Sequence, residues 1–315
     1  MLEFAVLGSG SSGNSAVVCA GDTRLLIDAG LSARQICRRL EVIGIDPDSL
    51  SAILLTHEHG DHVRGIDVFC RKRKLPVYAT AHTAALVREQ VRSEVVWRPF
   101  EAGSRFSIGP VEAESFSVPH DAVDPVGFVL QAASSRLGIL SDVGHVTRLI
   151  VDRLRGVHTL FTEANYDELM LQNDTARPWP TKQRISNRHG HLSNEQTVEL
   201  VREVAGPDLQ RVVLGHLSSD CNCPDLASRL VRESLSRNGH SRVEVECAPR
   251  AEPLPLRPAC PPLYEEATAT SEEPVSVREN GCPPPRESAL HHDKPTANGP
   301  VAKEVSDSGQ LEWAF

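Results

Sequence analysis

The segment THEHGDHVRG, residues 56–65, places three histidines and one aspartate within six positions, directly after the apolar run SAILL at 51–55. A short apolar run of this kind is typical of a buried strand, so we expect these side chains to follow the end of a buried strand. Four such groups crowded together would repel one another or lack hydrogen-bond partners unless a cation neutralised them. The sequence therefore predicts a metal site with ligands from His57, His59, Asp61 and His62.

Further metal-binding side chains follow other apolar runs of the chain. Because strand ends at one edge of a sheet converge, we expect these side chains to meet in one cleft. Two divalent ions need about four ligands each, usually with one carboxylate between them. The nitrogen and oxygen donors suit two divalent ions, Zn²⁺ or Mn²⁺, and do not distinguish these metals. The side chains at strand ends are Asp28, His57, His120, Asp142, Glu163 and His216, of which His120, Asp142 and His216 complete the ligand sets.

The composition changes towards the end of the chain. Residues 248–315 hold 12 of the 22 prolines and carry a net charge of −5 within a total of −9. Such a segment cannot bury enough apolar surface to offset its ordering entropy. We therefore expect a folded domain over residues 1–247 and a proline-rich, acidic, disordered tail over 248–315.

The pattern over residues 1–247 predicts an α/β fold. Several early strands follow one another without helices between them, so a purely parallel doubly wound sheet fits poorly. Two packed mixed β-sheets with helices on their outer faces fit better. The expected strands are at 2–8, 15–20, 24–30, 51–57, 76–80, 128–133, 137–142, 159–164, 211–216 and 242–248, and the expected helices at 32–43, 61–73, 82–92, 145–155, 193–205 and 224–237.

Apolar windows, the first residues and the cysteine spacing indicate in which cellular compartment the protein is expected. No window approaches the roughly 18–20 uninterrupted apolar residues of a membrane span, and the first residues lack the pattern of a secretory leader. The eight cysteines are scattered without a C-x-x-C pair, which favours reduced thiols. We expect a cytoplasmic protein without a membrane partner, and the sequence does not indicate its oligomeric state.

A glutamate and a histidine downstream suggest acid–base chemistry. Glu163 ends an apolar run, and His191 stands just before a helix whose first residues, Ser193 and Gln196, have the pattern of a capping box. A helix N-terminus beside a histidine suits an anionic phosphate, so Ser193 is a candidate substrate contact. We expect Glu163 to orient His191, which would return a proton to the leaving oxygen, while Asp61 orients the nucleophile. An ordinary capped helix with a surface histidine is the alternative.

Two polar segments are candidates for substrate binding. The basic, proline-rich stretch at 177–188 is predicted to be a loop in which cations contact phosphates and an indole stacks on a base. The stretch GSGSSGNS at 8–15 would let the backbone approach a phosphate, although a hairpin turn explains it nearly as well. The candidate side chains are Ser12, Asn14, Arg177, Trp179, Lys182 and Arg184.

The motifs together resemble a known family. HEHGDH at 57–62, with LLIDAG before it and VPHD, LSDVG and LGHLS after it, is similar to the five-motif signature of metallo-β-lactamase-fold hydrolases. The resemblance covers about residues 1–247 and implies a four-layer αββα fold. It implies one metal on His57, His59, His120 and Asp142, a second on Asp61, His62, Asp142 and His216, and Asp28 as the group that orients ligand histidines.

Within that family, LGSGSSGNS at 7–15, GHLSNE at 190–195 and HLSSDCN at 216–222 most resemble the YycJ/WalJ-like branch. The branch implies a DNA exonuclease with a dinuclear metal centre and an activated hydroxide. The spacing of Glu163 and His191 also resembles the ribonuclease Z type, so an RNA-processing nuclease remains an alternative. Hydrolysis of a small thioester or cyclic phosphodiester, and a binding protein that uses metals only for its shape, are further alternatives.

Overall fold

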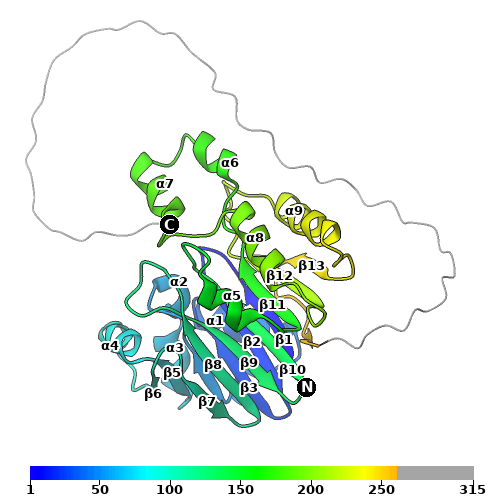
Figure 1. Ribbon diagram of the computed structural model, residues 1–315. Helices are drawn as coiled ribbons and strands as arrows, with labels where there is room; N and C mark the ends of the chain where they lie inside the picture. Colours follow the sequence, from blue (N-terminus) through cyan, green and yellow to red (C-terminus); the bar gives the residue numbers. More distant parts are fainter. Residues whose placement is uncertain (261–315) are drawn as a thin grey trace, which may run out of the picture. The chain divides into compact units, whose positions relative to one another are not determined.

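A computed structural model describes residues 1–260, which form two seven-stranded β-sheets packed face to face with helices outside them (Figure 1). This confirms the predicted αββα architecture of two packed mixed sheets with outer helices.

The first sheet is antiparallel among its strands within residues 3–27 and 257–258, and parallel among its strands within residues 23–100. In spatial order it consists of β14 (Arg257–Pro258), β1 (Glu3–Gly8), β2 (Ser15–Ala20), β3 (Thr23–Ile27), β4 (Ala52–Leu54), β5 (Pro76–Thr80) and β6 (Val96–Phe100). The second sheet is antiparallel from β7 to β10 and parallel from β10 to β13. In spatial order it consists of β13 (Glu244–Cys247), β12 (Arg211–Gly215), β11 (Thr159–Glu163), β10 (Ser135–Leu140), β9 (Val126–Ala132), β8 (Val111–Ser117) and β7 (Arg105–Ile108).

The helices connect strands and cover the outer faces of the sheets. Those of the first half are α1 (Ala33–Val42), η1 (Pro47–Ser49), α2 (Gly60–Val63), α3 (Ile66–Lys72) and α4 (Ala81–Gln90). Those of the second half are α5 (Arg148–Leu154), α6 (Glu168–Asn173), α7 (Trp179–Ser186), α8 (Asn194–Val204) and α9 (Pro224–Arg237). Figure 1 shows α6 and α7 extending beyond the sheets.

Three apolar layers hold this arrangement together. Phe4, Phe128 and Phe161 lie in the layer between the sheets. Ile36 and Phe69 belong to the layer under α1 and α3 on the first sheet, and a third layer lies under α5, α8 and α9 on the second. Burial of large apolar side chains contributes about 1.5–3 kcal/mol each, so the sheets form a rigid base for the loops at their edges.

Several elements differ from the sequence-based expectation. The strands β6, β7 and β8 and the helices α6 and α7 were not predicted. The residues of β6 and β7 are all exposed or half-buried, and β8 contains several polar residues, so none of these strands shows the apolar run of a buried strand. The helix expected over 61–73 is two helices that meet at Gly65. A Cβ at Gly65 would lie 2.2 Å from the Leu31 carbonyl oxygen, so the backbone itself packs there and the helix changes direction.

The domain boundary expected after residue 247 lies too early. Residues 257–258 form β14, which pairs with β1, and Ala259 is completely buried. The Leu254 amide donates to the Val6 carbonyl at 2.9 Å, and Leu254 packs against the layer between the sheets. The segment 248–260 is thus held by the fold because it covers the edge of β1. The rest of the predicted tail lies outside the described residues.

Two smaller expectations concern membranes and thiols. Within residues 1–260, none of the helices combines the length and the apolar character that crossing a membrane requires. Free thiols are present at Cys19, Cys37, Cys70, Cys221, Cys247 and Cys260, as the scattered spacing predicts. Cys223 is disulfide-bonded, so the expectation of reduced thiols is wrong at that position.

Candidate metal centre

The loops that follow β3, β10 and β12 adopt a backbone conformation that side chains rarely allow. Asp28, Asp142 and His216 have φ angles of 56°, 57° and 52°, and each lies within two residues of its strand end. A non-glycine residue in this region costs about 1–3 kcal/mol and persists only where its surroundings hold it. All three are predicted site residues, and they are three of the four non-glycine residues with positive φ in the described part of the chain, so most of this strain lies at the predicted site.

The motif HEHGDH turns from strand into helix, as predicted. His57 lies in the extended segment after β4, and His59 is the N-cap of α2, which carries Asp61 and His62. The imidazoles of His57, His59 and His120 offer ligand atoms that all lie within 4.8 Å of one another. These three side chains form a first group that can hold a metal.

Asp142 connects this group with a second one. Its carboxylate oxygens lie 3.1 Å from His62 Nε2, 3.0 Å from His216 Nδ1 and 3.9 Å from His120 Nε2. Asp61 Oδ2 is 3.6 Å from His62 Nε2 and 3.8 Å from His216 Nε2. Asp142 thus connects the two sets of imidazoles into one cluster of side chains that could hold metal.

Burial and the neighbouring carboxylates shift the pKa values of the clustered histidines in opposite directions. Burial, together with neighbouring imidazoles, holds the pKa of His57 well below its usual value, so His57 is neutral. Burial also opposes charge on His62, but Asp142, Asp28 and Asp61 outweigh it and raise the pKa of His62 well above 6.5. The carboxylates therefore attract a cation into the site.

The buried His57 ring provides the test of whether a metal fits. His57 Nε2 has no hydrogen-bond partner, whereas Nδ1 lies 2.9 Å from Thr56 Oγ1. A buried nitrogen without a partner costs about 1–3 kcal/mol. A divalent cation would satisfy it, and the histidine and aspartate donors around it are those that Zn²⁺ or Mn²⁺ accepts, so the residues present fit a metal.

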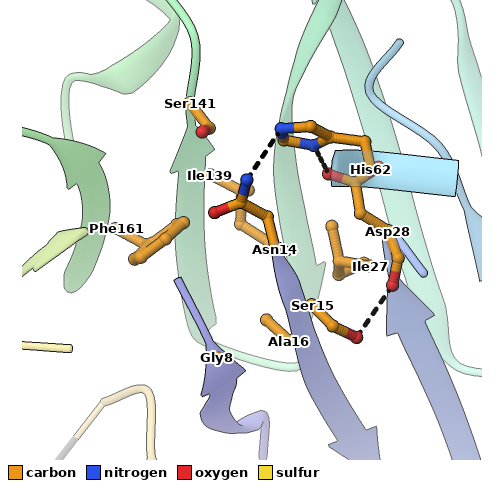
Figure 2. A pocket seen from close by; sticks show the side chains of 10 residues that line it. All are labelled: Gly8, Asn14, Ser15, Ala16, Ile27, Asp28, His62, Ile139, Ser141 and Phe161. Carbon is orange, nitrogen blue, oxygen red and sulfur yellow. Dashed lines mark hydrogen bonds and ion pairs between the residues drawn. The ribbon is translucent and has the colours of Figure 1, made fainter. Parts of the chain in front are cut away.

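Asp28 forms a hydrogen bond with the His62 ring on the side away from Asp142. Its Oδ2 accepts a hydrogen bond at 2.8 Å from His62 Nδ1, and its Oδ1 accepts the Thr56 amide at 2.8 Å. Figure 2 shows Asp28 on one side of the His62 ring and Asn14 on the other. Because Nδ1 is occupied by Asp28, the ring turns Nε2 towards Asp142, as the role predicted for Asp28 requires.

Glu163 and His191 form the predicted pair. His191 Nδ1 lies 3.0 Å from Glu163 Oε2, while Oε1 of the completely buried Glu163 accepts the backbone amides of Val143 and Leu192 at 2.6 and 3.1 Å. Burial disfavours the imidazolium, but the Glu163 charge outweighs it and raises the pKa of His191 to about 9. His191 is therefore protonated at neutral pH and lies 3.6 Å from Asp142, beside the metal ligands.

The three candidate substrate contacts near α8 and in the glycine-rich turn differ in their exposure to solvent. Ser193 is completely buried and its hydroxyl accepts the Gln196 amide at 3.3 Å, so it caps α8 and does not face a substrate. Ser12 is exposed, and its carbonyl accepts a hydrogen bond from Arg64. Asn14 is buried beside Asp61 and His62. Of these three residues, only Ser12 has the exposure expected of a substrate contact.

The basic stretch is not the loop that the sequence predicted, because Pro178 and Pro180 begin the helix α7. Arg177 binds Asp174 at 2.7 Å and Asp220 at 2.8 Å, so it fixes the base of this segment and is not open to a phosphate. Lys182 donates to the Gln172 carbonyl, and Trp179 is 66% exposed. Arg184 binds Asp121 at 2.7 Å, which brings α7 to the metal site.

Asp121 and Thr56 belong to the site but were missed by sequence reasoning. Asp121 Oδ1 lies 3.3 Å from His120 Nε2, and Thr56 Oγ1 lies 2.9 Å from both Asp28 Oδ2 and His57 Nδ1. Each residue is the immediate neighbour of a predicted ligand. Their positions inside the motifs VPHD and THEHGDH were the available signal.

Comparisons with known proteins agree with this geometry. A family model described as "Beta-lactamase superfamily domain" matches residues 23–217. The chain is 33% identical to exodeoxyribonuclease YycJ of Bacillus anthracis over 240 residues, 76% of this chain and 90% of that one. It is 34% identical to exodeoxyribonuclease WalJ of Streptococcus pneumoniae over 239 residues, 75% and 88% of the two chains. The structure of the metallo-beta-lactamase fold protein YhfI from Bacillus subtilis has a TM-score of 0.62 at 15% identity, covering 80% of this chain and 98% of YhfI, a likeness of fold alone.

Proposed function

This chain belongs to the beta-lactamase superfamily, in the branch of YycJ and WalJ, and on that premise we propose that it is a DNA exonuclease with a dinuclear metal centre. The two relatives named as exodeoxyribonucleases are aligned over most of both chains, which supports DNA as the substrate. The observation that carries the hydrolytic part is the Asp142 carboxylate. Its oxygens lie within 3.9 Å of ring nitrogens of His62, His120, His191 and His216.

Two groups of side chains would hold the ions. His57, His59, His120 and Asp142 would bind one ion, and Asp61, His62, Asp142 and His216 the other, with Zn²⁺ and Mn²⁺ as the candidate metals. Bound divalent ions would supply a water of lowered pKa as the nucleophile and neutralise charge on a phosphate oxygen.

The chain's own residues would handle the protons and the orientation of the reactants. His191, charged because of Glu163, would give a proton to the leaving oxygen of the phosphodiester. Asp61 is partly exposed to the cleft and would accept a hydrogen bond from the attacking water. Glu163 does not face the substrate and would act only by fixing the tautomer, orientation and charge of His191.

The helix α7 offers the surface for the nucleic acid. Arg184 connects it through Asp121 to His120, and the exposed Trp179 stands on the same helix. Lys182 and Arg184 are half-buried and keep part of their side chains in solvent, where a cation can bind a phosphate, and an exposed indole can stack on a base regardless of sequence. We therefore assign Trp179, Lys182 and Arg184 to substrate binding, together with Ser12.

A degradation assay tests the proposal. Purified protein loaded with Mn²⁺ or Zn²⁺ is given end-labelled duplex DNA, single-stranded DNA and a 3′-extended tRNA, with Asp61→Ala as the inactive control. We expect progressive shortening of DNA by the native chain only, and the position of the label gives the polarity.

Two outcomes would contradict the assignment. A single cut in the tRNA without shortening of DNA would indicate the ribonuclease Z type. Hydrolysis of a small thioester or cyclic phosphodiester without any change in nucleic acid would leave the metal centre in place and remove the nuclease assignment.

A further inference from the structure

We propose that Asn14 is a positioning residue for the ligand Asp61, and that residues 9–14 form a frame for the second ligand group instead of a phosphate-binding turn. The inference rests on the metal centre proposed above and does not depend on which substrate is hydrolysed. It replaces the substrate-binding role that the sequence suggested for Asn14.

The orientation of the Asn14 carboxamide is fixed from both ends. Its Oδ1 accepts the Gly10 amide at 2.8 Å and the Ser9 hydroxyl at 3.3 Å. The amide nitrogen must then point the other way, where it lies 3.0 Å from Asp61 Oδ2 and 3.0 Å from His62 Nε2. Figure 2 shows the same side chain directed at the His62 ring. The Asn14 side chain thus holds the Asp61 carboxylate next to His62 Nε2.

The burial of Asn14 argues against a direct contact between its side chain and a substrate. Its exposed fraction is 6%, and both of its polar ends already have partners inside the protein. A small cavity lies next to it between the sheets, with a volume of about 10 Å³, which is close to the lower limit for one water molecule. A phosphate group cannot enter a space of this size.

The backbone of the same segment packs directly on the ligand helix. The Asn14 amide donates to the Asp61 carbonyl at 2.7 Å, and the Gly30 amide donates to the Asn14 carbonyl at 2.9 Å. A Cβ at Gly30 would lie 1.6 Å from the Asp61 carbonyl oxygen, and one at Gly13, whose φ is 147°, would lie 2.7 Å from the Gly30 oxygen. The close packing of the backbones at Gly13, Gly30 and Asp61 explains why these positions are glycines, and no phosphate contact is needed to explain them.

Ser9 extends the frame to a ligand from the other sheet. Its hydroxyl oxygen accepts the His216 amide at 2.7 Å and donates to Asn14 Oδ1 at 3.3 Å. His216 is one of the residues with a strained backbone, and this bond supports that conformation. One short segment therefore fixes Asp61 and His216 relative to each other, although they come from different sheets.

The experiment measures metal binding in the absence of substrate. Metal-free Asn14→Ala and Asn14→Leu variants of the full chain are titrated with Zn²⁺ in competition with a chromophoric chelator. Removing a group that orients a ligand lowers metal affinity about 10–100-fold, so we expect such a loss for one of the two ions and no change for the other. Asn14→Leu should lose about as much affinity as Asn14→Ala, because leucine is close to asparagine in size but has no N–H donor. Ser11→Ala, an exposed serine in the same turn, is the matched control.

Kinetics with DNA separate positioning from substrate contact. We expect kcat of Asn14→Ala to fall at limiting Zn²⁺ and to recover at high Zn²⁺, with KM for DNA unchanged. Unchanged Zn²⁺ affinity together with a raised KM would overturn the inference and make Asn14 a substrate contact. If Asn14→Ala does not fold, Ser9→Ala provides the test, and unchanged affinity for both ions in that variant would also overturn it. Because the titration contains no DNA, it gives an answer even if the nuclease assignment fails.

Discussion

Replacing Glu163 with glutamine should move the alkaline limit of activity. Burial of the imidazole lowers the pKa of His191, but the buried Glu163 carboxylate, with smaller contributions from Asp142 and Asp61, outweighs it and raises this pKa from 6.5 to about 9. Glutamine has nearly the same shape but no charge, so the pKa of His191 should return to 6.5 or below. The difference of roughly 2.5 units corresponds to about 3 kcal/mol in the stability of the imidazolium.

The sign of the effect follows from the role of His191 as an acid. The imidazolium is the active form, so native activity should persist until the pH approaches 9 and then fall. In Glu163→Gln the proton is lost above about pH 6.5, which makes the deficit less than about twofold at pH 6 and about thirtyfold at pH 8. Burial of the His191 ring would lower its pKa further and increase the deficit.

The assay is kcat/KM for end-labelled DNA between pH 5.5 and 9.5, with saturating metal at each pH. Glu114→Gln is the matched control, because Glu114 is also a buried carboxylate of the second sheet but is bound by Arg105 and Arg153. We expect this control to keep the native pH profile. Coincident alkaline limits in the native chain and Glu163→Gln would refute the reasoning, since Glu163 would then not set the charge of His191.

Three further predictions concern the ligands, the substrate surface and the end of the fold. Asp61→Ala should abolish turnover and lower the bound metal while the far-UV circular dichroism stays native; near-normal activity would exclude Asp61 as a ligand. Lys182→Glu should raise KM for DNA and reduce the salt dependence of binding by about one phosphate contact, with hydrolysis of a small phosphodiester unaffected. Ala259→Glu should lower the free energy of unfolding by more than about 2 kcal/mol, because it places a charge at a completely buried position. The exposed substitution Glu252→Ala should leave that free energy unchanged in the same urea titration, and equal stability of the two variants would contradict the assignment of this segment to the fold.

The cluster of histidines and aspartates could be predicted because neighbouring residues indicate its chemistry. HEHGDH crowds four side chains of metal-binding type, and the structure places its three histidines and Asp61 beside His120, Asp142 and His216. The pairing of Glu163 with His191 was predicted from a strand end, a capping box and the resemblance of their spacing to the ribonuclease Z type, and the two side chains lie 3.0 Å apart. For the side chains at strand ends, the rule that strand ends converge was sufficient.

The substrate contacts could not be predicted equally well. Ser193 and Arg177 have the residue types of phosphate ligands, but the capping box uses the first and two carboxylates bind the second. Asp121 was not singled out, although it connects α7 with His120. Whether a polar group is available to a substrate depends on the partners that the fold brings to it.

The sequence by itself indicated the histidine and aspartate cluster, the two mixed sheets and the Glu163–His191 pair, because periodicity and residue type act over a few neighbouring positions. Only the tertiary structure decided that residues 248–260 complete the first sheet, since β14 pairs with a strand more than two hundred residues earlier. It also decided that Asn14 faces Asp61 and not the solvent. Burial and hydrogen-bond partners arise from contacts between distant segments, and no local pattern contains them.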